Sequence, residues 1–271
     1  MLKDKKIAIL GVGKIGGMLT RAMIEQGVSR VEHIAGTTGH PQTAQRAAKS
    51  LGITVLCDNV EAVRDKDLVV LAVKPQGIGR VLDELKNALS PNQVVLSLAA
   101  ATSTQFIEAR LNEGTSVLRA MPNLPCLIGH GMSVLCPGRC ASETHVALAE
   151  TIFAAVGRVA TIDDERHMDA VTALSGSGPA YGYIVIESLA EGGVKAGLPR
   201  ALATTLAAQT MLGAAAMVLE TGEHPAKLKD MVTTPAGTTV DGLMALEEGN
   251  IRVALIKAVD AATEKSKALS R

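Results

Sequence analysis

Up to residue 162, short apolar runs rich in Val and Ile alternate with stretches whose apolar residues recur every three or four positions. The runs predict buried strands and the stretches predict amphipathic helices. The predicted strands are residues 6–11, 31–36, 53–56, 67–75, 93–99, 115–122, 131–137 and 157–162. The predicted helices are residues 16–27, 40–52, 77–89, 102–112 and 143–156. This alternation favours an α/β fold with a mostly parallel sheet covered on both faces.

The pattern changes after residue 162, where apolar residues keep helical spacing and no strand is convincing. We therefore expect two domains, residues 1–162 with the sheet and residues 163–271 with helices only. Residues 201–219 consist almost entirely of small and apolar residues, which leaves too few polar positions for a solvated helix face. This segment predicts a subunit interface, and hence an oligomer formed through the helical domain.

Composition narrows the possible partners and locations. Hydrophobic residues make up 47% of the chain and aromatic residues 1%, so the core must be aliphatic. The formal net charge is zero, which argues against nucleic acid as a partner. The apolar run near the N-terminus is too short for a signal peptide, and no segment has the uninterrupted apolar length of a membrane span. We expect a cytoplasmic protein that does not enter a membrane.

Metal binding is not expected, because the potential ligands lack the spacing of a metal site. The four cysteines show no C-x-x-C pattern and are expected to be buried apolar fillers or bystanders, and the six histidines are scattered singly. The cysteines are Cys57, Cys126, Cys136 and Cys140.

The sequence GVGKIG at residues 11–16 follows the first predicted strand and opens the first predicted helix. In a dinucleotide-binding loop, the glycines at Gly11, Gly13 and Gly16 allow a tight turn, a close approach to the pyrophosphate and close helix–strand packing. The helix N-terminus supplies free N–H groups to the phosphates. The context predicts a Rossmann-type domain whose cofactor contacts here are Gly11, Gly13, Lys14, Ile15 and Gly16.

The end of the second predicted strand lacks the Asp or Glu that usually binds the ribose 2′-hydroxyl of NAD. It reads AGTTGH, and hydroxyl and N–H groups at Thr37 and Thr38 would accept a 2′-phosphate that a carboxylate would repel. We therefore expect NADPH as the cofactor, with NADH possible.

Several further motifs resemble one family throughout the chain. They are AVKP at 72–75, SLAAATS at 97–103, ALSGSGPAY at 173–181, EGGVKAGLPR at 191–200, HPAKLKDMVTTPAGTT at 224–239 and DGL at 241–243. Together they resemble the pyrroline-5-carboxylate reductases, which make proline by reducing a cyclic imine with NADPH or NADH. The resemblance implies a Rossmann domain, an all-α C-terminal dimerisation domain, a homodimer, and in some members a ring of dimers.

The same resemblance implies positions for further cofactor contacts. Asn59 matches a contact on the adenosine side, and Asn123 and Pro125 match the family's loop in RAMPNLP. The remaining implied contacts lie along the cofactor or near its nicotinamide: Ala72, Val73, Lys74, Pro75, Ala99 and Ala100.

The stretch TTPAGTTVDGL at residues 233–243 places hydroxyl groups around a Pro-x-Gly turn in an apolar helical region. Gly237 allows close backbone approach, and a helix starting at Thr238 and Thr239 would offer N–H groups to a carboxylate. The alternative is that Thr238 is only an N-cap. The resemblance implies that Thr239 reaches the imine nitrogen and that Thr234 lies near the same ring.

Other interpretations remain open. Ser177 in SGSGP either caps the following helix or lines a pocket, and Lys227 and Lys229 are expected to face solvent. A β-hydroxyacid dehydrogenase is the alternative enzyme, although residues 164–178 lack the lysine that such enzymes usually carry. The alternative from another class is a dinucleotide-binding sensor without catalysis.

Overall fold

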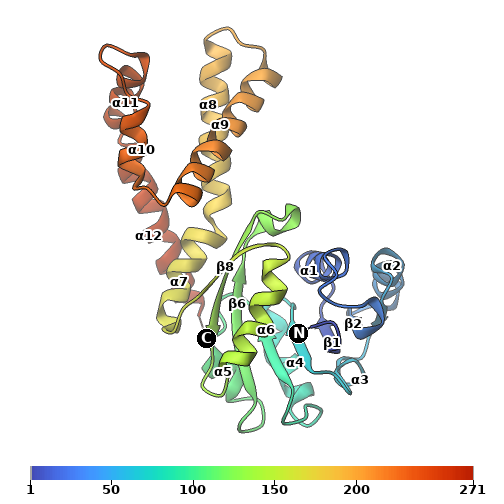
Figure 1. Cartoon of the computed structure of the whole chain (residues 1–271). Helices are drawn as coiled ribbons and strands as arrows, with labels where there is room; N and C mark the ends of the chain where they lie inside the picture. The colour runs from blue at the N-terminus through green and yellow to red at the C-terminus, as the bar shows by residue number, and fades with distance from the viewer. Residues whose placement is uncertain (1, 271) are drawn as a thin grey trace. The chain divides into compact units, whose positions relative to one another are not determined.

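The computed structural model describes residues 2–270, which form two compact units (Figure 1). The first unit comprises the chain up to Gly176 and from Ala262 onward, and the second comprises Ser177–Ala261. We call them the sheet unit and the helical unit.

The sheet unit contains eight strands in the order β3-β2-β1-β4-β5-β6-β7-β8. All neighbouring strands are parallel except β6 and β7, which are antiparallel. The strands are β1 Ile7–Leu10, β2 Ile34–Thr37, β3 Thr54–Leu56, β4 Leu68–Leu71, β5 Val94–Ser97, β6 Ser116–Pro122, β7 Gly131–Pro137 and β8 Gly157–Thr161. The mostly parallel sheet expected from the sequence is confirmed, with a strand at each predicted position.

Helices connect most of these strands. They are α1 Lys14–Glu25, α2 Pro41–Leu51, α3 Asn59–Val63, α4 Ile78–Leu85, α5 Thr104–Glu108, α6 Glu143–Ala154 and α7 Met168–Val171. The sequence pattern missed α3, whose five residues are too few to show a helical period. Its N-cap is Asp58, whose carboxylate accepts a hydrogen bond from the Glu61 N–H at 3.0 Å.

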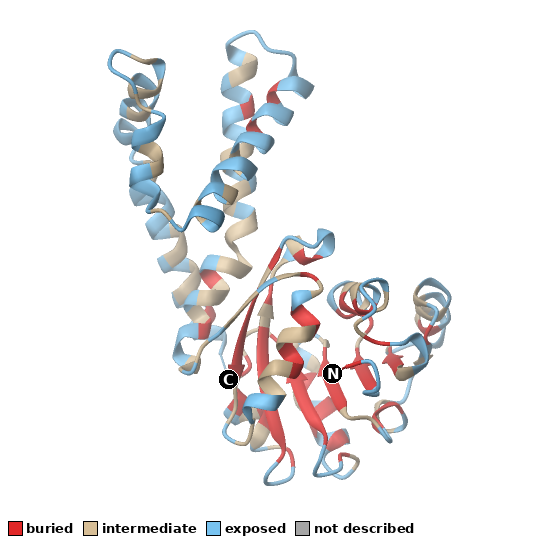
Figure 2. Ribbon diagram, viewed as in Figure 1, coloured by how far each residue is buried: buried red, intermediate tan, exposed pale blue. Residues whose placement is uncertain are grey.

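Two apolar clusters cover opposite faces of the sheet. Ile7 and Ile9 belong to one cluster and Ala8 and Leu10 to the other, as expected when alternate strand residues point to opposite faces. These side chains are fully buried, and β1, β2, β4 and β5 are buried along their whole length (Figure 2). The aliphatic core expected from the composition is therefore present.

Residues 163–176 pack with the sheet unit, although the sequence pattern assigns them to the helical domain. Met168 is fully buried in a cluster with Val134 and Cys136. Asp169 accepts hydrogen bonds from Ser266 at 2.6 Å and Ser270 at 3.0 Å. The compact units therefore divide at Gly176, whereas the change in hydrophobic pattern lies at residue 162.

The helical unit contains α8 Gly178–Lys195, α9 Arg200–Thr221, α10 Pro225–Met231, α11 Thr238–Glu248 and the first part of α12 Ile251–Leu269. Its one cluster of buried apolar residues in the described chain consists of Ala190, Ala203 and Ala207, where α8 meets α9. Most of its other residues are exposed or half-buried (Figure 2).

Among the described helices, α9 is long and apolar enough to cross a membrane by length and composition. Only 11% of its most apolar window is buried within the chain. The sequence analysis predicts that this same helix forms a subunit interface. A helix in such an interface can be as apolar as one that spans a membrane.

Candidate active site

The glycines of the GVGKIG loop occupy three different environments. Gly11 has a φ of 97°, and a Cβ atom there would lie 2.9 Å from the Ala72 carbonyl oxygen. A Cβ atom on Gly16 would overlap the Gly11 carbonyl oxygen, whereas one on Gly13 would meet no atom within 4 Å. Gly11 and Gly16 are thus required by the turn and by helix–strand packing, while the open side of Gly13 leaves room for a ligand.

The N-terminus of α1 is suited to an anion. Its N-cap is Gly13, with no side-chain capping bond, and its first turn carries no acidic residue. The N–H groups there have no side-chain acceptor, and the helix dipole adds partial positive charge. Lys14 and Ile15, the first two residues of the helix, are both exposed. The loop therefore fits the pyrophosphate of a dinucleotide.

Three neighbouring strands bring the predicted cofactor residues to one edge of the sheet. The strands β1, β4 and β5 lie side by side and parallel, so the loops that follow them meet at their carboxyl ends. These loops carry Gly11–Gly16, residues 72–75 and residues 99–100. The Ala72 N–H donates to the Leu10 carbonyl at 2.8 Å, which ties the second loop to the first strand. This edge is where open α/β sheets bind ligands.

A polar cluster lies at the carboxyl end of β2. The Thr37 hydroxyl donates to Asn59 Oδ1 at 2.8 Å, and Asn59 Nδ2 donates to Glu84 Oε2 at 2.9 Å. Thr37 is 3% exposed, while Thr38 is half-buried and donates from its hydroxyl to the His40 carbonyl at 3.2 Å. The structure therefore brings together Thr37, Thr38 and Asn59, and adds Glu84, which the sequence did not indicate.

A cavity of about 250 Å³ adjoins the start of α1. Its lining residues come from α1, the end of β6 and the segment before α8: Lys14, Ile15, Met18, Met121, Pro122, Asn123, Leu124, Leu127 and Gly176. Asn123 Nδ2 donates to the Ser175 carbonyl at 3.2 Å, and its Oδ1 accepts from the Met132 N–H at 2.9 Å. Asn123 is thus fixed at both ends of its amide in the wall of this cavity.

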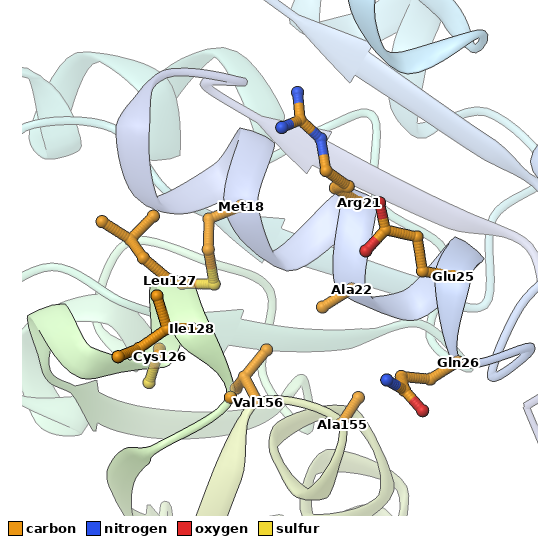
Figure 3. A pocket seen from close by; sticks show the side chains of 11 residues that line it. Met18, Arg21, Ala22, Glu25, Gln26, Cys126, Leu127, Ile128, Ala155 and Val156 are labelled. Atoms are coloured by element: carbon orange, nitrogen blue, oxygen red, sulfur yellow. The ribbon is translucent and has the colours of Figure 1, made fainter.

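A second cavity of about 330 Å³ lies further along α1 and shares Met18 and Leu127 with the first (Figure 3). Met18, Ala22 and Val156 supply apolar surface, and Arg21 and Glu25 supply charge. None of these residues belongs to the sequence-predicted site.

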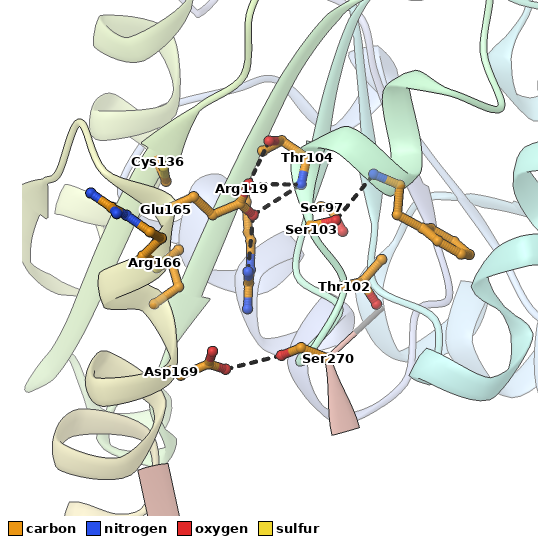
Figure 4. A network of polar contacts seen from close by, with 12 residues as sticks. Ser97, Thr102, Ser103, Thr104, Arg119, Cys136, Glu165, Arg166, Asp169 and Ser270 are labelled. Atoms are coloured by element: carbon orange, nitrogen blue, oxygen red, sulfur yellow. Dashed lines mark hydrogen bonds and ion pairs between the residues drawn. The ribbon is translucent and has the colours of Figure 1, made fainter. Parts of the chain in front are cut away.

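A buried ion pair joins β6 to the segment after β8 (Figure 4). Arg119 Nη1 lies 2.9 Å from Glu165 Oε1, and the Arg119 side chain is 5% exposed. Glu165 also accepts from the Thr104 N–H at 2.9 Å and from the Thr104 hydroxyl at 2.6 Å. The sequence missed this network because its members lie 46 and 61 positions apart.

Cys136 lies beside this ion pair and is buried. Burial raises the pKa of its thiol to about 11, and the nearby Glu165 carboxylate adds to the rise. The thiol is therefore protonated at neutral pH, which suits the expected role of an apolar filler rather than a nucleophile. Within residues 2–270, no group of three or more His, Cys, Asp or Glu residues could hold a metal ion.

The threonine-rich stretch forms a turn and a helix start in the helical unit. The Gly237 N–H donates to the Thr234 carbonyl at 2.9 Å, and Ala236 within the turn has a φ of 55°. The helix α11 begins at Thr238, and its N-cap is Gly237 without a side-chain capping bond. The alternative in which Thr238 is the N-cap is therefore wrong, and the expected helix start is present.

Other expectations for the helical unit have mixed outcomes. Lys227 is exposed and pairs with Glu223 at 2.7 Å, as expected of a solvent-facing lysine, while Lys229 is half-buried and pairs with Asp230 at 3.0 Å. Ser177 is the N-cap of α8 but makes no side-chain capping bond. The predicted cofactor residues all lie in the sheet unit, and Thr234, Gly237, Thr238 and Thr239 all lie in the helical unit.

Comparison with protein-family models gives two matches. Residues 165–269 match the model described as pyrroline-5-carboxylate reductase dimerisation. Residues 6–101 match the model described as NADP oxidoreductase, coenzyme F420-dependent.

Individual relatives match the chain from end to end. A pyrroline-5-carboxylate reductase from Methanosarcina acetivorans is 44% identical over 270 residues, which is 100% of each chain. The solved structure of a pyrroline-5-carboxylate reductase from Coxiella burnetii has a TM-score of 0.92 and 35% identity, covering 98% of this chain and 99% of that one. A Plasmodium falciparum pyrroline carboxylate reductase solved with NADP bound has a TM-score of 0.88 and 31% identity over 100% of both chains.

Proposed function

Because the chain belongs to the pyrroline-5-carboxylate reductase family, we propose that it reduces 1-pyrroline-5-carboxylate to L-proline, the final step of proline biosynthesis. The observation that carries this proposal is the similarity to reductases over the full length of the chain. Both predicted halves of the site are present within that length: the glycine loop of the sheet unit and the threonine turn of the helical unit.

NADPH is the proposed cofactor, with NADH as a possible substitute, and it supplies a hydride when bound. The residues fit such a group, since Gly13 is open and the N–H groups at the start of α1 have no side-chain cap. Gly11, Gly13, Lys14, Ile15 and Gly16 would hold the pyrophosphate. Thr37, Thr38 and Asn59 would hold the adenosine end, and Ala72, Val73, Lys74, Pro75, Ala99 and Ala100 would line the remainder.

Thr234, Gly237, Thr238 and Thr239 are the proposed substrate-binding residues. The N-cap of α11 makes no side-chain capping bond, so the first N–H groups of this helix are available to a small carboxylate, against the negative charge of Asp241 in the same turn. Thr239 is the second residue of this helix and is half-buried, and its hydroxyl is proposed to bond the imine nitrogen.

The chemistry needs positioning more than acid catalysis. Hydride addition to a C=N bond requires a protonated or hydrogen-bonded nitrogen, and a cyclic imine can carry that proton itself. A hydroxyl at Thr239 would orient the ring and stabilise the nitrogen as its charge changes. No histidine or acid pair is required for this role.

A homodimer and a small-molecule substrate follow from the dimerisation-domain match and from the named relatives. We propose that the exposed apolar surface of the helical unit forms the dimer contact, with a ring of dimers as a further possibility. We also propose that the enzyme is cytoplasmic and that α9 packs against a second subunit rather than in a membrane. Neither nucleic acid nor a metal takes part.

Steady-state oxidation of NADPH with pyrroline-5-carboxylate tests the proposed function. We expect turnover with this substrate and none with a panel of β-hydroxyacids and NADP. Turnover restricted to β-hydroxyacids would support the dehydrogenase alternative. Tight NADPH binding without turnover of either substrate class would support the non-catalytic sensor.

A further inference from the structure

The fold places a carboxylate where the sequence pattern lacks one. The end of β2 carries no acidic residue, but Glu84 of α4 accepts a hydrogen bond from Asn59 Nδ2 at 2.9 Å. Asn59 in turn accepts from the Thr37 hydroxyl, and Thr37 is the last residue of β2. Glu84 therefore lies two hydrogen bonds away from the strand end at which dinucleotide-binding folds usually carry an acid.

The direction of these hydrogen bonds is fixed by Glu84. An ionised carboxylate only accepts hydrogen bonds, so the amide nitrogen of Asn59 must face Glu84 and its oxygen must face Thr37. The single hydroxyl proton of Thr37 is then donated to Asn59 Oδ1. Its oxygen remains able to accept from the Gly11 N–H at 3.3 Å, which connects the cluster to the phosphate loop.

The charge of Glu84 is only weakly neutralised. Among the described residues Glu84 pairs with Arg80, whose Nε lies 3.5 Å from Glu84 Oε1 and whose side chain is 83% exposed. Such an exposed pair is screened by solvent and contributes little. The adenosine ribose is expected beside the end of β2, so a 2′-phosphate that also bonded to Asn59 would lie about 5 Å from the Glu84 carboxylate.

We propose that Glu84 is a specificity-determining residue, which lowers the affinity for a 2′-phosphorylated dinucleotide relative to an unphosphorylated one. The proposal rests on the dinucleotide site of the proposed function. Glu84 acts through its charge and through its control of the Asn59 amide. It partly replaces the acidic residue missing after β2, and it moves the cofactor preference away from NADPH and toward NADH.

The test measures dissociation constants for NADPH and NADH with the full-length enzyme, using the fluorescence of the reduced nicotinamide at low ionic strength. In E84Q the acceptor to Asn59 is kept and the charge is removed. We expect its Kd for NADPH to fall about three- to tenfold relative to wild type, with the Kd for NADH within about twofold. Calorimetry with 2′,5′-ADP and 5′-AMP should show the same selective change without the nicotinamide.

Two variants on the same helix serve as controls. D83N removes the same charge from the exposed neighbouring residue, which does not bond to Asn59, and should leave the ratio of the two dissociation constants within about twofold. R80Q removes the cation paired with Glu84. It should raise the ratio of the Kd for NADPH to the Kd for NADH, which is the opposite of the change expected in E84Q.

The proposal would be overturned if E84Q left the ratio of the dissociation constants for NADPH and NADH unchanged, whether or not both constants changed. So would the absence of binding of either dinucleotide to the wild-type enzyme. Failure of the proposed function is distinguishable, because in that case both dinucleotides bind with the expected E84Q response but pyrroline-5-carboxylate is not reduced.

Discussion

The sheet unit and the helical unit treat their apolar side chains in opposite ways. In the sheet unit, large aliphatic residues on both faces of the sheet are buried, including Ile7, Leu10 and Leu68. In the helical unit, the described buried cluster consists of three alanines, while Ile184 is 63% exposed and Leu206 49% exposed. The sheet unit therefore buries a large aliphatic core within one chain, whereas the helical unit presents apolar surface that a monomer rarely leaves in water.

The ion pairs of the two units also differ in burial. The sheet unit contains the buried Arg119–Glu165 pair, whereas the described ion pairs of the helical unit, such as Arg252–Glu247, are all largely exposed. Buried pairs hold elements of one chain in fixed positions, and exposed pairs contribute little. The exposed charges and apolar side chains of the helical unit are consistent with the match to a dimerisation domain.

The largest expected effect comes from placing a charge on the exposed apolar surface of α9. Leu206→Glu would bury an unpaired carboxylate in the dimer contact, at a cost of about 3–5 kcal/mol, and weaken association about 10²- to 10⁴-fold. Sedimentation measured over a range of protein concentrations should show monomers where the wild type is dimeric.

Val31→Glu is the matched control, since Val31 is a 36% exposed apolar residue of the sheet unit. In sedimentation this variant should show the same dimer mass as the wild-type protein. A Leu206→Glu variant that also remained fully dimeric at low micromolar concentration would show that α9 does not form the contact.

The next effect concerns the buried ion pair of the sheet unit. Glu165→Gln leaves the Arg119 guanidinium buried without a carboxylate, which should reduce the free energy of unfolding by about 3 kcal/mol. Urea unfolding of the two proteins at pH 7 measures the difference. A change no larger than that of an exposed charge substitution would contradict a structural role for this pair.

A third prediction separates the functions of the two units. Thr239→Ala should lower kcat about 10²-fold, because the proposed bond to the imine nitrogen is lost, while the Kd for NADPH stays within about twofold. Thr239→Ser keeps the hydroxyl and should retain most of the activity. Full activity of the alanine variant would remove Thr239 from the mechanism, and a parallel loss of NADPH affinity would argue that the units do not act separately.

Much of the fold could be predicted because it depends on local patterns. The predicted strands and the helix start at Thr238 were found from hydrophobic period and turn residues, and both are present. The antiparallel pairing of β6 with β7 and the short helix α3 were not found. Periodicity reports which residues are buried, but strand direction depends on the length and path of a connection, and a helix of one turn has no measurable period.

The candidate site was predicted less completely, for a related reason. The glycine loop is a contiguous motif, so its turn could be found from spacing alone. Glu84 and Glu165 act on residues 25 and 46 positions away, and no local signal marks either as a partner. The resemblance to a family indicated Asn59 and Thr239, but not the groups that orient Asn59.

The smallest expected effect is a dependence of stability on pH from an exposed pair next to the buried one. The Arg166 guanidinium donates to both carboxylate oxygens of Asp164 and lowers its pKa to about 2. Because the folded-state pKa lies below the usual aspartate value of 3.8, the ionised carboxylate stabilises the folded state above that pH. This contribution is lost as the pH falls through about 2.

Asp164→Asn should therefore lower the free energy of unfolding slightly at pH 7, and by much less than Glu165→Gln does. The difference from wild type should shrink between about pH 4 and pH 2, and it should shrink at pH 7 in high salt, since the pair is exposed. Urea unfolding across this pH series measures both effects. A difference in the free energy of unfolding that grew on acidification would have the wrong sign for a carboxylate with a lowered pKa. A difference as large as that of Glu165→Gln would remove the distinction between buried and exposed pairs.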